Sequence, residues 1–114
     1  MNKNPLKEKS FQFALQIISL YKQLIDEQKE FVLSKQILRS GTSIGANIRE
    51  AQNAENKADF IHKLSIAQKE CDETIYWLEL LHQSAYLAES FFNTLNTKAN
   101  ELLKMLRSSI ITTK

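Results

Sequence analysis

The sequence predicts an all-α protein, an antiparallel up-down-up-down four-helix bundle formed by one domain over residues 1–114. Three observations support this fold class. Apolar residues recur at intervals of three and four in four separate stretches, which is the spacing of one helix face. Only one proline and two glycines occur, whereas strands and tight turns would use more of both. The connections between the stretches are short and polar, which favours antiparallel neighbours.

The first helix is expected over about residues 5–27. Asn4 followed by Pro5 has the pattern of an N-cap with proline in the first helical position, where its missing N–H costs nothing. Ile17 and Leu24 widen an apolar stripe that alternates by three and four. The residues of that predicted buried stripe are Phe11, Ala14, Ile18, Tyr21 and Ile25.

The second helix is expected over about residues 35–54, with Ser34 as its N-cap. Leu33 and Leu38 on either side of this cap can form a hydrophobic staple. The helix contains both glycines of the protein, and each costs about 1 kcal/mol relative to alanine. We therefore expect close packing of a neighbouring helix or subunit against Gly41 and Gly45. The predicted buried stripe is Ile37, Gly41, Ile44, Ile48 and Ala51.

The third and fourth helices are expected over about residues 57–83 and 88–111. Asn56 is a cap candidate and resembles a capping box with Asp59, while Asn53 and Asn56 both tolerate left-handed backbone angles. The stripe of the third helix is Phe60, Leu64, Ala67, Cys71, Thr74, Leu78 and Leu81. The stripe of the fourth is Phe92, Leu95, Ala99, Leu102 and Leu106, with Phe91, Leu103 and Ile110 beside it.

Composition and charge narrow the class of protein. Hydrophobic residues at 43% and charged residues at 25% are ordinary for a soluble domain. The single cysteine and the lack of a signal-like or membrane-spanning apolar run favour a reducing cytoplasm. The net charge of +2 is uneven, because residues 1–50 and 91–114 each carry +3 and residues 51–90 carry −4. Such asymmetry suits a nucleic-acid partner or subunits that attract each other.

Two segments carry a resemblance to a known family. LRSGTSIGANIREA, residues 38–51, and DFIHKLSIAQKECDETIYWLELL, residues 59–81, resemble the small bacterial four helix bundle protein family. Its members include the proteins encoded in intervening sequences of the 23S rRNA gene, and the chain is also similar to the accessory proteins of diversity-generating retroelements. The resemblance covers nearly the whole chain. It implies a four-helix bundle that assembles into a ring, commonly a pentamer.

The residue patterns typical of catalytic, metal and phosphate sites are absent or misplaced. Asp59-x-x-His62 and Glu79-x-x-His82 each have half of a di-iron pattern, but they lie about 30 Å apart on one helix. Cys71 falls on the buried stripe, with no histidine within a turn of it. The segment Gly41 to Gly45 lacks the lysine and the preceding strand of a phosphate-binding loop. We predict no catalytic residue, cofactor or metal, and no enzyme activity.

Two groups of residues on the second and third helices are candidates for interhelical or subunit contacts. The first is an interhelical ion-pair cluster of Arg39, Glu50, Glu70 and Glu73. The alternative is that these four side chains are separately solvated. The second is an outer strip of the third helix. Tyr76 and Trp77 are adjacent, so at most one lies in the core of the chain. The other joins a strip with Ile66, Glu73 and Leu80, and two strips on one helix favour a homo-oligomer. The candidate helix or subunit contacts are Gly41, Gly45, Ile66, Glu73 and Trp77.

Basic residues supply the candidate phosphate contacts. The wider set that could follow the backbone of a nucleic acid is Lys22, Lys35, Arg39, Arg49, Lys98, Lys104 and Arg107, and the leading candidates are Lys35, Arg39, Arg49, Lys104 and Arg107. No helix-turn-helix or RNA-binding motif favours reading of bases, and a net charge of +2 argues against tight binding. The sequence predicts a scaffold or adaptor that contacts RNA or DNA non-specifically. The alternative is a protein-protein module that binds no nucleic acid.

Overall fold

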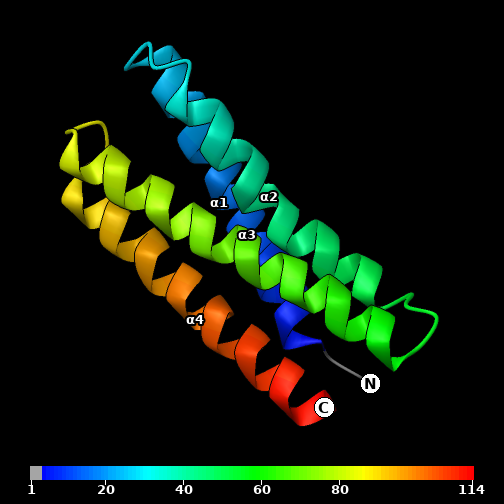
Figure 1. The fold of residues 1–114 in the computed structure, drawn as a ribbon. Coiled ribbons are helices and arrows are strands. Elements are labelled where there is room, and N and C mark those ends of the chain that lie inside the picture. Colours follow the sequence, from blue (N-terminus) through cyan, green and yellow to red (C-terminus); the bar gives the residue numbers. More distant parts are fainter. Residues whose placement is uncertain (1–3) are drawn as a thin grey trace.

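A computed structural model describes residues 4–114, and these residues form a bundle of four helices (Figure 1). No strand occurs within the described part. The prediction of an all-α bundle is confirmed, and each helix runs antiparallel to the one before it; residues 1–3 of the predicted domain lie outside the described residues. The helices are α1 (Pro5–Asp26), α2 (Leu33–Ala51), α3 (Lys57–Gln83) and α4 (Glu89–Thr113).

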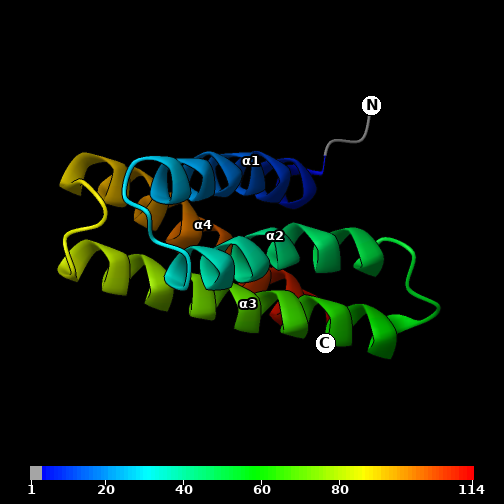
Figure 2. The ribbon, with the colours of Figure 1, turned by 90° about the horizontal axis from the view of Figure 1, so that it is seen from above.

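The helices follow one another around the bundle. α2 contacts α1 and α3, and α4 contacts the same two helices from the other side. Within the described residues no Cα atom of α1 lies within 8 Å of one in α3, and Figure 2 shows the two helices along opposite edges of the bundle. The contact between α1 and α4 is the smallest of the four, and it is bridged by an ion pair of 2.9 Å between Lys9 Nζ and Glu101 Oε1.

Three of the four predicted core stripes are confirmed. Every residue of the α2 stripe is buried, which includes Gly41. On α3 and α4 the stripes are buried except that Phe60, Phe91 and Phe92 are half-buried at the ends of the bundle. The bundle therefore has one continuous core that runs along its whole length.

The predicted stripe of α1 is wrong, although Ile17 and Leu24, which were expected to widen it, are buried. The core residues of this helix are Leu6, Ser10, Phe13, Ile17, Leu20 and Leu24. Phe11, which began the predicted stripe, is 49% exposed, and the rest of that stripe is half-buried. Leu15, one turn after Phe11, is 47% exposed. The helix is thus rotated so that part of a long apolar surface faces outward.

Gly41 explains this rotation. A Cβ atom built at Gly41 would lie 2.8 Å from both Cγ atoms of Ile17, well inside contact distance. The missing side chain lets Ile17 insert against the backbone of α2, which is the close packing predicted for the second helix. Gly45 is less crowded, because a Cβ there would lie 3.4 Å from the backbone oxygen and the hydroxyl of Ser10. Both glycines therefore face α1 of the same chain.

The predicted N-caps of α1 and α3 are confirmed. The side chain of Asn4 accepts a hydrogen bond of 3.0 Å from the N–H of Lys7, ahead of Pro5 in the first turn. Asn56 accepts one of 2.8 Å from the N–H of Asp59, whose carboxylate reaches back to the N–H of Glu55. These bonds satisfy donors that have no partner inside a helix.

The predicted N-cap of α2 is wrong. Ser34 is fully buried inside the first turn, and its hydroxyl has no hydrogen-bond partner among the described residues. The carboxylate of Glu30 takes the capping role, because it accepts hydrogen bonds of 3.2, 3.1 and 2.7 Å from the N–H groups of Val32, Leu33 and Ser34. A glutamate placed before the helix can reach all three donors, and its negative charge interacts favourably with the positive end of the helix dipole.

The predicted bounds of α2 also change, since the helix begins at Leu33 rather than at residue 35 and ends at Ala51 rather than at residue 54. Left-handed backbone occurs at Lys29 (φ 55°) and Ala85 (φ 68°), not at the predicted Asn53 or Asn56. After α3, the N–H of Tyr86 bonds to the carbonyl of Leu81 at 2.9 Å, which closes the helix end in a Schellman-like turn.

The two glycines of α2 give a matched pair of substitutions. We expect Gly41→Ala to lower the free energy of unfolding by about 1–2 kcal/mol, because overpacking against buried Ile17 outweighs the gain in helix propensity. Gly45→Ala should leave it unchanged or raise it by up to about 1 kcal/mol, since its new methyl group meets ordinary contacts. Urea unfolding followed by circular dichroism measures both. Equal effects at the two positions would contradict the assigned packing.

The capping of α2 gives a second pair. Glu30→Ala should destabilise the protein by about 1–2 kcal/mol, because three N–H groups lose their acceptor. Ser34→Ala should be neutral or stabilising by about 1 kcal/mol, because it removes a buried hydroxyl without a partner. If Ser34 were the cap, the same measurement of unfolding free energy would show the larger loss for Ser34→Ala.

Candidate interaction surfaces

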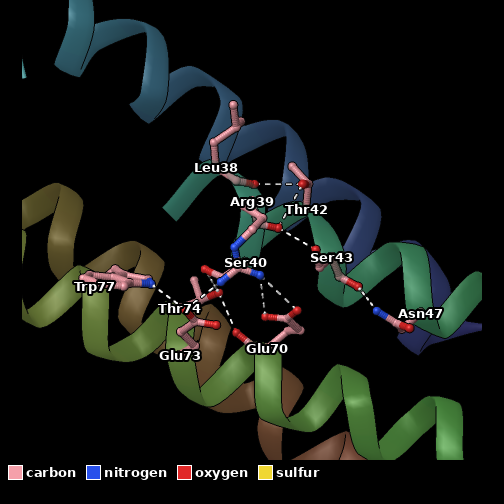
Figure 3. A network of polar contacts seen from close by, with 10 residues as sticks. All are labelled: Leu38, Arg39, Ser40, Thr42, Ser43, Asn47, Glu70, Glu73, Thr74 and Trp77. Atoms are coloured by element: carbon pink, nitrogen blue, oxygen red, sulfur yellow. Dashed lines mark hydrogen bonds and ion pairs between the residues drawn. The ribbon is translucent and has the colours of Figure 1, made fainter. Parts of the chain in front are cut away.

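A network of charged and polar side chains joins α2 to α3 (Figure 3). Arg39 Nη1 lies 3.1 and 3.2 Å from the two carboxylate oxygens of Glu70, and Arg39 Nη2 lies 2.6 Å from Glu73 Oε1. The same Glu73 oxygen accepts a hydrogen bond of 3.2 Å from the indole N–H of Trp77. The predicted interhelical ion-pair cluster is therefore present for Arg39, Glu70 and Glu73.

The ion pairs of the network favour the charged forms of Arg39 and Glu73. The hydrogen bond from Arg39 is the largest cause that lowers the pKa of Glu73 below its usual value, with Trp77 adding to it. The bonds to Glu73 and Glu70 raise the pKa of Arg39. Because Glu73 binds its proton less readily when folded, its contribution to stability is present above the unfolded carboxyl pKa of about 4 and is lost as the pH falls through the folded value.

A buried pair of hydroxyl groups lies beside this network. Ser40 and Thr74 are completely buried, and their hydroxyl oxygens are 2.8 Å apart in a hydrogen bond. Thr74 Oγ1 also lies 2.7 Å from the backbone oxygen of Glu70. The pair therefore fixes the register of α2 against α3, and its polar groups are satisfied within the core.

Glu50 does not belong to the cluster, contrary to the sequence prediction. It forms a separate ion pair of 2.9 Å with Lys63 Nζ. Its position eleven residues after Arg39 gives it the same face of α2. Those eleven residues also place it about 16 Å further along the helix axis, next to the first turns of α3.

The aromatic pair of α3 divides between the chain's own packing and its surface. Trp77 is half-buried and packs against the core, so the prediction that at most one of the pair lies inside is confirmed. Tyr76 is 54% exposed, and its ring meets that of Trp77 edge to face at 5.1 Å. Trp77, proposed from sequence as a subunit contact, is thus largely used within the chain; Ile66 and Glu73 of the same strip are half-buried. The exposed aromatic is Tyr76.

An apolar groove runs between α1 and α2 on the outside of the bundle, and we call it the α1–α2 groove. It has a volume of about 470 Å³. Its charged residues are Lys7, Arg49 and Glu50, and the last is already paired with Lys63. The guanidinium of Arg49 lies 5.9 Å above the ring of Phe11. The apolar and small residues that line the groove are Phe11, Ala14, Leu15, Ile18, Thr42, Gly45 and Ala46.

The sequence prediction missed this groove because Phe11 and its stripe were assigned to the core. The available signal was the breadth of apolar character on α1, where Leu15 flanks the predicted stripe on one side and Ile17 and Leu24 widen it on the other. Such breadth indicates a second apolar surface, but it does not show which surface is the outer one.

The five leading phosphate candidates do not form one stripe. Lys35, Arg39 and Arg49 lie on α2, whereas Lys104 and Arg107 lie on α4, and these two helices are not adjacent, since no pair of their Cα atoms among the described residues lies within 8 Å. Arg39 is held by two carboxylates. Lys104 lines a shallow polar hollow on α4 with Asn96 and Asn100.

The cysteine and histidine residues are placed as follows. Cys71 is fully buried, its Sγ lies 3.2 Å from the backbone oxygen of Ala99, and burial raises its pKa to about 12. The ring of His82 stacks on Phe92 at 4.2 Å. Among residues 4–114, no three His, Cys, Asp or Glu side chains come close enough to hold a metal ion. In the same part of the chain, the search for a helix able to cross a membrane found none.

Comparisons with known proteins place these features in context. The model of the 23S rRNA-intervening sequence protein family matches residues 2–108. A crystal structure of a protein of unknown function from the S23 ribosomal protein family of Bacteroides thetaiotaomicron VPI-5482 is 57% identical. It superposes with a TM-score of 0.91, and the match covers 92% of this chain and 97% of that one. A search of curated proteins gave no match.

The network of Figure 3 gives a test of stability and of its pH dependence. We expect Arg39→Met to lower the free energy of unfolding by about 1 kcal/mol at neutral pH, because two carboxylates lose a shared partner at the surface. The loss should shrink as the pH falls below about 4 and through the lowered pKa of Glu73 in the folded protein, where that carboxylate gains its proton. Lys9→Met, which breaks the ion pair to Glu101 with both side chains about half exposed, is the control and should cost less. A pH-independent loss would contradict this account.

Proposed function

Because this chain belongs to the 23S rRNA-intervening sequence protein family, we propose that it acts as a non-enzymatic scaffold or adaptor that assembles from several copies of itself. The observation that carries the proposal is the apolar surface left outside a filled core. Phe11 and Leu15 on α1 and Tyr76 on α3 are each about half exposed. Large apolar side chains left exposed in this way are typical of protein-protein interfaces.

The assembly that we propose is a ring, and the pentamer implied by the family resemblance is its expected size. A ring repeats each surface feature several times. Weak contacts that one copy cannot use alone then act together, as in other multivalent binders.

A more specific version of this function is non-specific contact with RNA or DNA. Lys104 and Arg107 on α4 support it, because neither forms an ion pair within the described residues. Repetition of these cations around a ring would increase the number of phosphates neutralised at once. The partner is then a nucleic acid or a protein that processes one, and the resemblance to retroelement accessory proteins remains a prediction that points the same way.

The alternative function is a protein-protein module that binds no nucleic acid. The pairing of Arg39 with Glu70 and Glu73 favours it, since this cation is not available to phosphates. The division of the remaining candidates between α2 and α4 also favours it.

Binding of labelled RNA and DNA across a series of salt concentrations separates the two functions. If phosphates are contacted, the logarithm of the association constant falls steeply with the logarithm of the salt concentration. Lys104→Gln with Arg107→Gln should then weaken binding and reduce the slope by about 1 for each phosphate contact removed.

The control is Lys9→Gln with Lys63→Gln, which removes the same net charge from cations already paired with carboxylates. It should leave the slope closer to that of the unchanged protein. Absence of binding at low salt would eliminate the nucleic-acid form and leave the protein-protein module. A molecular mass of 13.2 kDa at all concentrations in sedimentation would overturn self-association itself.

A further inference from the structure

Two of the exposed apolar surfaces lie on different sides of the bundle. The α1–α2 groove has Phe11 and Leu15 on its α1 wall, both about half exposed. Tyr76 lies on α3, and its exposed fraction is 54%. α1 and α3 run along opposite edges of the bundle (Figure 2), so one contact with a flat partner cannot cover both surfaces.

The groove has a basic rim. Lys7 and Arg49 line it, and neither forms an ion pair within residues 4–114. The negative charge of Glu50 is balanced by Lys63. Small side chains line its α2 wall, because Gly45 and Ala46 are among the residues that α2 contributes to the groove.

The surface next to Tyr76 is acidic, and Lys69, an exposed lysine on the same side of α3, lies two turns away. Asp72 and Glu79 lie four residues before it and three residues after it, so all three side chains share the outer side of α3. Both carboxylates are exposed and form no ion pair within the described residues. Leu80, one turn after Tyr76, adds half-buried apolar area. We call these residues the Tyr76 face: Asp72, Tyr76, Glu79 and Leu80.

The Arg39 network positions this face. Glu73 is held by Arg39 and accepts the indole N–H of Trp77, and the ring of Trp77 meets that of Tyr76 edge to face, with 65° between the ring planes. The exposed tyrosine therefore has a neighbour whose orientation is fixed by hydrogen bonds. An aromatic side chain that is ordered before binding loses little entropy when it enters a groove.

We propose that the Tyr76 face of one copy docks into the α1–α2 groove of the next copy, in a head-to-tail contact. This inference rests on the proposed self-association and names its two surfaces. Tyr76 supplies an aromatic side chain to an apolar groove, and Asp72 and Glu79 approach Lys7 and Arg49. Because the two surfaces differ, the contact is heterologous, and successive copies form a closed ring or a filament rather than a two-fold dimer.

The test uses two variants, each of which blocks one surface. Leu15→Glu places a carboxylate in the groove, where it repels Asp72 and Glu79 of the incoming copy. Tyr76→Lys removes the aromatic ring and places a cation against Lys7 and Arg49. Both positions are exposed, and circular dichroism verifies that each variant folds. Ile111→Lys, at a side chain that is 73% exposed near the end of α4, is the matched control.

Sedimentation velocity should show each blocking variant at the monomer mass of 13.2 kDa under conditions where the unchanged protein and the control assemble. An equal mixture of the two variants should form a dimer of twice that mass. The intact Tyr76 face of the Leu15→Glu chain fits the intact groove of the Tyr76→Lys chain, and no further copy can add.

The other outcomes distinguish failure of head-to-tail docking from failure of self-association. A mixture that stays monomeric overturns head-to-tail docking. Assembly of Tyr76→Lys alone, with Leu15→Glu monomeric, shows that the groove pairs with itself. If the unchanged protein and both variants assemble equally, this inference fails and the proposed self-association stands. If the unchanged protein is monomeric at every concentration, both fail.

Discussion

The contact between Ile17 and the backbone of α2 at Gly41 is the constraint on which the arrangement of this bundle depends. Ile17 is completely buried, and a methyl group at position 41 would overlap it. The contact turns Phe13, Leu20 and Leu24 toward the core, because they share a face of α1 with Ile17. Phe11 and Leu15 then necessarily point outward. One glycine therefore determines both the filling of the core and the character of the outer surface.

α2 connects this contact to the opposite side of the molecule. Its other edge is held to α3 by the hydroxyl pair of Ser40 and Thr74 and by the ion pairs of Arg39. Those ion pairs lead through Glu73 to Trp77, and from there to the exposed Tyr76. Packing inside the chain thus orients both of the surfaces proposed to meet between copies.

Much of the fold could be predicted from the sequence, and the failures have physical causes. On α2 and α4 one apolar stripe is set off by polar neighbours, and on α3 the core stripe keeps a strict alternation of three and four beside its second strip, so periodicity identified the core of these helices. α1 is apolar over a wide arc, and the choice between the stripe of Phe11 and that of Ile17 is made by the tertiary contact with Gly41. A pattern confined to one helix does not contain that information.

Side-chain reach explains the other differences. Serine is a common N-cap residue, but here Glu30 accepts the hydrogen bonds of the first-turn N–H groups from outside the helix. Ser34 therefore lies buried inside the first turn. Glu50 shares the helix face of Arg39, yet the distance along the axis pairs it with Lys63. The candidate surface was predicted in part: Glu73 and the glycines have the expected neighbours, while Leu15 and Tyr76 emerge only once the rotation of each helix is known.

Hydroxyl-radical footprinting over a range of protein concentrations tests the central claim most directly, because it reports the exposure of individual side chains. In dilute solution Phe11, Leu15 and Tyr76 should be modified while Phe13 and Ile17 are protected. As the concentration rises, Phe11, Leu15 and Tyr76 should become protected together. Equal modification of Phe11 and Phe13 in dilute solution, or exposure of Tyr76 that does not change with concentration, would contradict it.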